Sequence, residues 1–165
     1  MSEERQTNDY VAIYKAQLAK GDIQIAYERL IKYVMLLKAQ FSKVFSGKYQ
    51  TGNVSPGYMD YTYFPFFDDY LRSNKLRFGI VLNHEKMRFE LWLMGQNADV
   101  QTEYWDLLKT TEWNKEQIVM PKYSVLETVL VENPDFNEPE LLADKILKAS
   151  ISVSVDIENH IKNMN

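Results

Sequence analysis

The sequence predicts an α+β fold, in which a mainly antiparallel sheet of about four strands is combined with an N-terminal helix pair and a long C-terminal helix. Apolar residues recur at intervals of three or four near both ends of the chain, which is typical of amphipathic helices. Between residues 75 and 94, apolar and polar residues alternate in two runs around a short polar segment, which is typical of a β-hairpin. With 165 residues, the chain 1–165 is expected to form a single α+β domain.

The N-terminal part is expected to form two helices, at residues 9–20 and 22–45. Gly21 stands where a left-handed C-terminal cap belongs, and Asp22 can cap the second helix. The first helix should turn one side inward, formed by Val11, Tyr14 and Leu18. The second helix should bury an apolar stripe made of Ala26, Leu30, Val34, Leu37, Phe41 and Val44.

Residues 46–57 form the one clear loop of the sequence, because they are rich in Gly, Ser, Asn and Pro. The glycine beside Lys48 does not indicate a phosphate-binding loop, since no strand precedes it and no helix opens directly after it. A strand is expected at 58–64, ended by Pro65, and a short helix is expected at 66–72.

The alternating segments on either side of residues 83–86 are expected to pair as a β-hairpin. Folding there sets Leu82 opposite Met87 and Ile80 opposite Phe89. One face of the hairpin is then apolar, and its members are Leu76, Phe78, Ile80, Leu82, Met87, Phe89, Leu91 and Leu93. A slip of one residue would scatter these side chains, so the apolar pattern is expected to specify the pairing.

After the hairpin, a helix is expected from Asn97, as its N-cap, to about residue 109, and a strand is expected at 123–131. The inward side of this helix should consist of Val100, Tyr104, Leu107 and Leu108. A last helix should begin at the capping pair Asn137 and Glu140. Residues 150–155 alternate with period two and could form a strand, but we expect helix there because both flanks are helical.

The composition excludes several classes of site. No cysteine is present, which excludes disulfides, thiolate nucleophiles and cysteine-ligated metals. The two histidines, His84 and His160, have no partner pattern around them, and His84 is expected to be a solvated residue at the hairpin tip. No catalytic residue, no metal site and no cofactor is therefore expected.

The net charge of −4 is unevenly distributed along the chain. Residues 10–50 hold seven Lys or Arg against two Asp or Glu, whereas residues 97–165 hold six against thirteen. We expect the two parts to neutralise each other within one fold, and nucleic acid is not the expected partner because it needs a clustered basic footprint. No apolar run approaches the roughly 20 residues that span a bilayer, so no membrane partner is expected and a cytoplasmic location is expected.

The second face of the hairpin is the candidate binding site. The candidate site residues, including two tyrosines from the preceding strand, are Arg77, Arg88, Glu90, Trp92, Tyr61 and Tyr63. Arginine offers an anion a bidentate fork, tryptophan offers a stacking surface, and Gly79 would leave room above Glu90. We therefore expect a non-enzymatic protein that binds a small anionic ligand or a protein partner. The alternative is an outer face whose arginines and Glu90 form a solvent-exposed charge ladder, worth about 0.2–1 kcal/mol per pair.

The run Tyr63-Phe64-Pro65-Phe66-Phe67 and the two arms at 76–84 and 88–93 resemble an uncharacterised family of small bacterial cytosolic proteins. The resemblance covers nearly the whole chain. Because the family has no assigned activity, the resemblance implies no catalytic residue. In the order of its elements, the chain is also similar to the small α+β domains that accompany restriction-nuclease-like proteins.

Two further functions stay open. A nucleic-acid enzyme or accessory protein related to restriction nucleases would use Asp60 and Glu90 to hold Mg²⁺, but Trp92 stands where its lysine should be. A structural homo-oligomer, such as a homodimer, would use some of the 11 tyrosines at the subunit contact.

Overall fold

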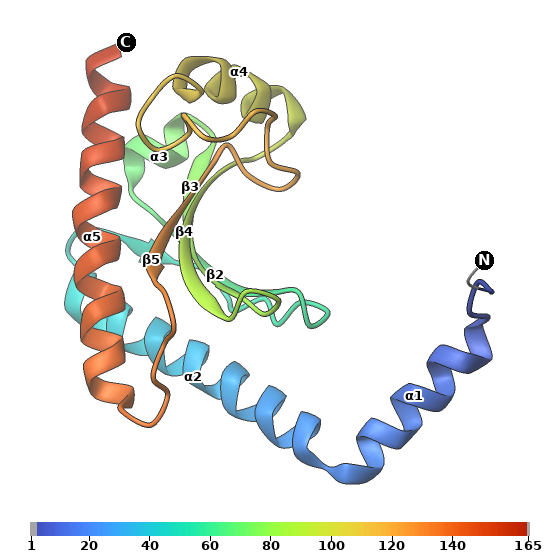
Figure 1. Cartoon of the computed structure of the whole chain (residues 1–165). Coiled ribbons are helices and arrows are strands. Elements are labelled where there is room, and N and C mark those ends of the chain that lie inside the picture. Colours follow the sequence, from blue (N-terminus) through green and yellow to red (C-terminus); the bar gives the residue numbers. More distant parts are fainter. Residues whose placement is uncertain (1–2, 165) are drawn as a thin grey trace. The chain divides into compact units, whose positions relative to one another are not determined.

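The computed structural model describes residues 3–164 (Figure 1). The elements follow in the order α1 (Thr7–Lys20), α2 (Asp22–Phe45), β1 (Gln50–Thr51), β2 (Tyr61–Phe67), α3 (Asp69–Ser73), β3 (Leu76–Asn83), β4 (Arg88–Gly95), α4 (Ala98–Leu108), β5 (Leu126–Val131) and α5 (Pro139–Met164). The predicted α+β class, the antiparallel sheet, the N-terminal helix pair and the long C-terminal helix are confirmed. The sheet has five strands rather than about four, because the loop expected at 46–57 contributes the two-residue strand β1.

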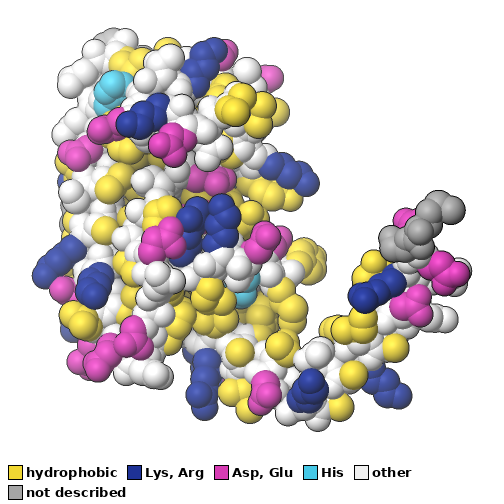
Figure 2. Space-filling view, viewed as in Figure 1, with side chains coloured by type: hydrophobic (Ala, Val, Ile, Leu, Met, Phe, Trp, Pro, Cys, Tyr) yellow, Lys and Arg dark blue, Asp and Glu magenta, His cyan; other side chains and the backbone are white. Residues whose placement is uncertain are grey.

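The contacts within the chain define two compact units, 1–33 and 34–165. The first unit holds α1 and the first half of α2. Gly21 separates these helices with a φ of 82°, and its N–H donates to the carbonyl of Leu18, which confirms the predicted cap. The predicted inward side of α1 is wrong, because Val11 and Tyr14 are 53% and 61% exposed and no residue of this helix is buried. Apolar and charged side chains are interspersed along α1 in Figure 2.

In the second unit, the C-terminal half of α2 belongs to the apolar core. Val34, Leu37 and Phe41 are buried as the stripe predicts, whereas Val44 is exposed. The ring centroid of Phe41 lies 4.6 Å from that of Phe66 in β2, which fixes this half of the helix against the sheet. The predicted stripe is therefore correct in its middle and wrong at both ends, because Ala26 is exposed as well.

The five strands form an antiparallel meander in the order β1-β2-β3-β4-β5. One face of the sheet, here called the inner face, is apolar over its three central strands apart from the buried Thr62 at the start of β2. Its buried members are Phe64, Phe66, Phe78, Ile80, Leu82, Phe89, Leu91 and Leu93. The C-terminal half of α2 and α5 cover this face, while the opposite side of the curved strands faces away from α5 (Figure 1).

The hairpin of β3 and β4 is confirmed, but its predicted register is wrong by two residues. Leu82 lies opposite Phe89 and Ile80 opposite Leu91. The turn consists of residues 84–87, and it includes Met87, whose φ is 46°. Because side chains alternate with period two, a shift of two residues changes every cross-strand partner. Apart from Met87, all residues of the two strands stay on their predicted faces.

The prediction that Pro65 ends its strand is wrong. β2 continues to Phe67, and the carbonyl of Pro65 accepts a hydrogen bond of 2.9 Å from the N–H of Gly52. In an antiparallel strand, the N–H and C=O of one residue point to the same neighbour. The missing N–H of Pro65 therefore falls on the side of the short β1, and the ladder with β3 is intact.

The two helices at the end of the sheet are capped by side chains. Asp68 accepts from the N–H of Leu71 at 2.9 Å and begins α3, which is shorter than the predicted helix. Asn97 accepts from the N–H of Val100 at 3.0 Å, which confirms the predicted cap of α4. Leu107 of α4 was expected inside but is 37% exposed.

The last helix, α5, is continuous through residues 150–155, so the helical interpretation of this segment is confirmed. Its alternating serines fit a helix because the hydroxyls of Ser150 and Ser154 donate to backbone carbonyls one turn earlier. α5 begins at Pro139, and the predicted strand before it is shortened to Leu126–Val131. None of the helices within residues 3–164 is long and apolar enough to cross a membrane.

Candidate functional site

The second face of the sheet, opposite the inner face, carries all six predicted site residues on three adjacent strands. β2 contributes Tyr61 and Tyr63, β3 contributes Arg77, and β4 contributes Arg88, Glu90 and Trp92. The expected register would have paired Arg77 with Trp92, Gly79 with Glu90 and Val81 with Arg88. The observed register instead places Met94 opposite Arg77, Gly79 opposite Trp92, and Asn83 opposite Arg88. The residues therefore share one face, but they fall into two groups with different surroundings.

The first group is a buried network around Glu90, which is 2% exposed. Its carboxylate accepts hydrogen bonds from Arg88 Nε at 2.7 Å, from Trp92 Nε1 at 2.9 Å and from Asn83 Nδ2 at 3.0 Å. Arg88 also donates to Glu132 at 2.8 Å. A buried carboxylate needs such donors. Its hydrogen bond with Trp92 in turn fixes the position of the indole ring. This network differs from the alternative of a solvent-exposed charge ladder, because Glu90 is buried.

The second group lines a hollow of about 370 Å³ on the same face. We call it the aromatic hollow, and its principal lining residues are Tyr61, Tyr63, Arg77, Trp92, Met94 and Tyr123. The Tyr61 ring meets the Trp92 ring edge to face at 4.7 Å, and its centroid lies 6.3 Å from that of Tyr123. The volume falls in the range of pockets that hold small molecules, which are mostly apolar with a few polar groups.

Two charged residues line the aromatic hollow, and they differ in how they are engaged. Asp60 Oδ1 accepts from the backbone N–H groups of Tyr58 and Tyr61 at 2.8 and 2.7 Å. These two hydrogen bonds lower the pKa of Asp60, so this carboxylate stays ionised and holds the loop before β2. Arg77, by contrast, is exposed and forms no salt bridge with any residue between 3 and 164. Its guanidinium is the free cation of the hollow.

The space above Gly79 is occupied rather than open, which corrects the expectation of room above Glu90. A Cβ atom at Gly79 would lie 2.7 Å from Met94 Cε and 3.4 Å from Tyr63 Cδ2. Gly79 therefore lets Met94 and Tyr63 pack closely on the sheet, where they join the apolar cluster that includes Trp92.

His84 is half-buried, so the expectation of a solvated turn residue is wrong. Its Nε2 atom lies 2.7 Å from Thr62 Oγ1, and Thr62 donates its own hydroxyl proton to the carbonyl of Pro56 at 2.7 Å. Nε2 must therefore be the donor toward Thr62, and burial lowers the pKa of His84 despite the opposing charge of Asp60. The pair ties the hairpin turn to the loop, and the histidine does not accept the Thr62 proton.

Asp60 and Glu90, the two carboxylates that a restriction-type nuclease would need, are engaged separately. Asp60 is bound by backbone N–H groups and Glu90 by three side-chain donors. Within the described part of the chain, no group of three or more His, Asp or Glu residues could hold a metal ion.

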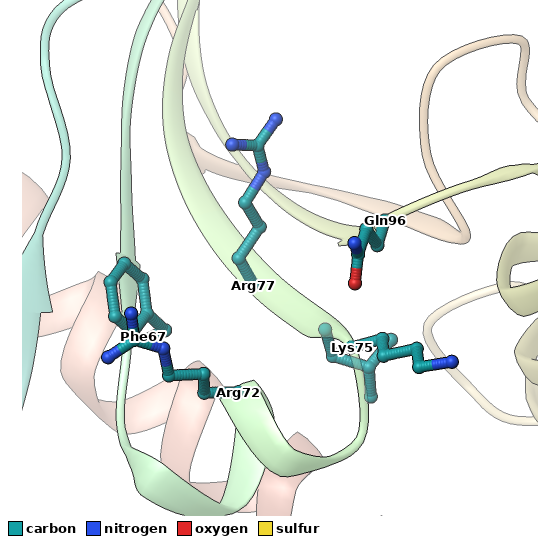
Figure 3. A pocket seen from close by; sticks show the side chains of 6 residues that line it. Phe67, Arg72, Lys75, Arg77 and Gln96 are labelled. Carbon is teal, nitrogen blue, oxygen red and sulfur yellow. The ribbon is translucent and has the colours of Figure 1, made fainter.

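The structure also contains a site that the sequence interpretation missed. A second hollow of about 260 Å³, here called the basic pocket, is lined by Phe67, Arg72, Lys75, Leu76, Arg77 and Gln96 (Figure 3). Arg77 lines this pocket as well as the aromatic hollow. The sequence does indicate this pocket, because residues 72–77 hold three basic residues and no acidic one. The net charge of the longer range 51–96 is zero, and this average concealed the basic cluster.

The comparisons with known proteins agree with the resemblance noted in the sequence. No curated protein and no solved structure was found to match this chain. One family model matches residues 7–161, and its description is a domain of unknown function, DUF7000. The expectation of an uncharacterised family is confirmed, and the match covers nearly all of the described residues. The chain therefore belongs to the DUF7000 family.

Proposed function

We propose that this protein is a binding protein whose aromatic hollow takes a small ligand made of a planar ring and a negatively charged group. The observation that carries the proposal is the free cation of Arg77 at the wall of a hollow that Tyr61, Tyr63 and Trp92 also line, whereas the other charged residue of the hollow, Asp60, is engaged by backbone N–H groups. The ring would lie against the aromatic side chains, and the anionic group would meet the guanidinium fork.

The surroundings of the hollow favour binding because they are rigid before the ligand arrives. Trp92 is held by its hydrogen bond to Glu90, and Glu90 is held by Arg88. A side chain that is already fixed loses little conformational entropy on binding, which raises affinity. In this proposal, Arg88 and Glu90 support the site, and Arg77, Trp92, Tyr61 and Tyr63 contact the ligand.

We propose binding rather than catalysis because Asp60, which lines the hollow, and the nearby His84 are engaged in structure. Asp60 holds the loop, and His84 donates to Thr62 instead of removing its proton. Neither arrangement prepares a nucleophile or a general base for a bound molecule. The absence of cysteine further supports our inference that the protein binds its ligand in a reducing cytoplasm.

The test uses 1-naphthalenesulfonate, a planar ring with one negative charge, and the indole N–H signals of the three tryptophans in a nitrogen–proton correlation spectrum. We expect the signal of Trp92 to shift on titration, while those of Trp105 and Trp113 stay in place, because only Trp92 lines the hollow. Trp105→Phe and Trp113→Phe assign the signals.

Two variants locate the bound ring and charge. Arg77→Gln removes the cation and Tyr63→Ala removes part of the aromatic wall, so each should weaken binding about tenfold. Lys115→Gln, which removes an exposed charge elsewhere, is the control and should leave binding unchanged. A Trp92 signal that does not move, or an affinity that neither variant reduces, would show that the aromatic hollow is not a ligand site.

A further inference from the structure

The basic pocket concentrates positive charge without compensation. Arg72, Lys75 and Arg77 line it, and no carboxylate is among the lining residues. Within residues 3–164, none of the three forms a salt bridge. One of these cations, Arg72, lies over the Phe67 ring, whose centroid is 5.5 Å from Arg72 Cζ. Three like charges around one pocket repel each other, and a multiply charged anion would relieve this repulsion.

The cations reach the pocket from consecutive elements, which explains why they gather there. Arg72 is on α3, Arg77 is the second residue of β3, and Lys75 lies in the connection with a φ of 58°. The N–H of Gln96 donates to the carbonyl of Lys75 at 2.9 Å, which brings the end of β4 to the same place. Figure 3 shows Arg72 beside Phe67, Arg77 rising from β3 between Phe67 and Gln96, and Lys75 on the side of Gln96.

The donor set fits a phosphate group better than a single carboxylate. Two arginine forks and one ammonium group together supply more charge-assisted donors than the two oxygens of a carboxylate can use. A phosphate monoester carries close to two negative charges at neutral pH and has three terminal oxygens that accept hydrogen bonds. The three cations of the pocket therefore suit a dianion with three acceptor oxygens better than a singly charged carboxylate.

Arg77 connects this pocket to the aromatic hollow, because it lines both. We propose that the basic pocket is a phosphate subsite, and that the ligand of this face is a phosphorylated planar compound, with its ring in the aromatic hollow and its phosphate between Arg72, Lys75 and Arg77. This inference rests on the proposed function, since the ring position is the one proposed there. The class of ligand has the chemistry of a mononucleotide or of a phosphorylated ring cofactor.

The experiment compares 1-naphthyl phosphate with 1-naphthalenesulfonate, which have the same ring and differ in the charge of the anionic group and in the ester oxygen that joins the phosphate to the ring. At about pH 7.5 the phosphate is nearly a dianion. It should bind the full-length protein about tenfold more tightly than the sulfonate, measured by the shift of the Trp92 indole signal. The double variant Arg72→Gln/Lys75→Asn should remove this advantage and leave the binding of the sulfonate unchanged, because neither residue lines the aromatic hollow.

The variants and their control are chosen to preserve the fold. Arg72 and Lys75 are exposed, and asparagine tolerates the left-handed backbone at position 75. The control, Lys115→Gln/Lys145→Gln, removes the same net charge from exposed positions that line neither pocket. It should retain the full advantage of the phosphate.

The outcomes separate the two proposals. If the sulfonate shifts Trp92 but the phosphate binds no tighter, or if its advantage survives in the double variant, the phosphate subsite is overturned and the aromatic hollow stands. If neither compound shifts Trp92 while inorganic phosphate shifts the backbone amide of Lys75, the proposed function fails and the combined ligand fails with it. Tighter binding of a single-stranded oligothymidine than of 1-naphthyl phosphate, with steep salt dependence, would overturn the small-ligand assignment in favour of a nucleic-acid surface.

Discussion

The inner face and the second face of the sheet are built from the same strands, but they achieve burial in different ways. β4 supplies both: Phe89, Leu91 and Leu93 enter the apolar core, while Glu90 and Trp92 are buried on the other side. On the inner face, removal of apolar surface from water is favourable by itself. On the second face, the carboxylate is tolerated only because three donors satisfy it. The inner face therefore provides stability, and the second face provides a fixed arrangement of functional groups.

The strongest way to test this comparison is to create a cavity in the inner face. Phe78 is fully buried, and its ring is stacked on that of Phe66 at 5.4 Å. Phe78→Ala should lower the free energy of unfolding by about 3–5 kcal/mol, measured by urea denaturation. As a control, Tyr58→Ala removes a ring that is 95% exposed and should change stability by less than about 0.5 kcal/mol. Equal losses in the two variants would contradict the assignment of the core.

A smaller loss is expected when the network of the second face is broken. Glu90→Leu leaves the indole N–H of Trp92 without an acceptor and leaves Arg88 with Glu132 alone. We expect a loss of about 2 kcal/mol, because the buried donors lose their partner while Arg88 keeps some access to solvent. Glu90→Gln keeps one acceptor oxygen and should lose about half as much. A leucine variant as stable as the wild type would show that the network has no role in stability.

The smallest effect concerns a buried carboxyl group beneath the inner face. Glu158 of α5 is buried, and its Oε2 accepts from the hydroxyl of Tyr49, whose ring packs 5.0 Å from Phe66. Burial, together with the nearby Asp68, raises the pKa of Glu158 above its ordinary value of 4.5, although Lys162 opposes the shift. At a pH between the unfolded and the folded pKa, Glu158 therefore keeps its proton in the folded protein and releases it in the unfolded chain. The free energy of unfolding should then decrease as the pH rises from about 4.5 through the folded pKa.

Denaturation at several pH values, with Glu158→Gln for comparison, measures this contribution. The glutamine variant cannot lose a proton at position 158, so its stability should decline less between pH values of about 5 and 8 than that of the wild type. Parallel pH profiles for the two proteins would rule out a raised pKa at this residue.

The sequence was informative wherever a short-range pattern decides the structure. The period of two in 76–94 assigned nearly every hairpin residue to its correct face, and the capping role of Asn97 follows from local chemistry. The register was not predictable in the same way, because a shift of two residues leaves the apolar pattern equally well buried. The continuation of β2 through Pro65 depended on the length of β1, which no local signal reports.

The site was predictable as a set of residues but not as a set of roles. Arg77, Tyr61, Tyr63 and Trp92 share the aromatic hollow, as their positions in alternating strands suggested. The hydrogen bond from Asn83 to Glu90 depends on the actual register. The sequence alone could therefore not show that the Glu90 carboxylate is occupied by hydrogen bonds within the protein. The basic pocket depends on the meeting of the two ends of the β3–β4 hairpin, which is a tertiary contact.

The position of Pro65 has a consequence for the behaviour of the protein at high concentration. Exposed sheet edges can recruit strands from other molecules and so begin fibril growth. On this side of the sheet, the two residues of β1 and the bridge between Ser55 and Tyr63 already occupy the edge of β2, and Pro65 between them has an imide nitrogen with no proton to donate. The edge is thereby protected against polymerisation by a very short strand, by the bridge at Ser55 and by the covalent structure of Pro65.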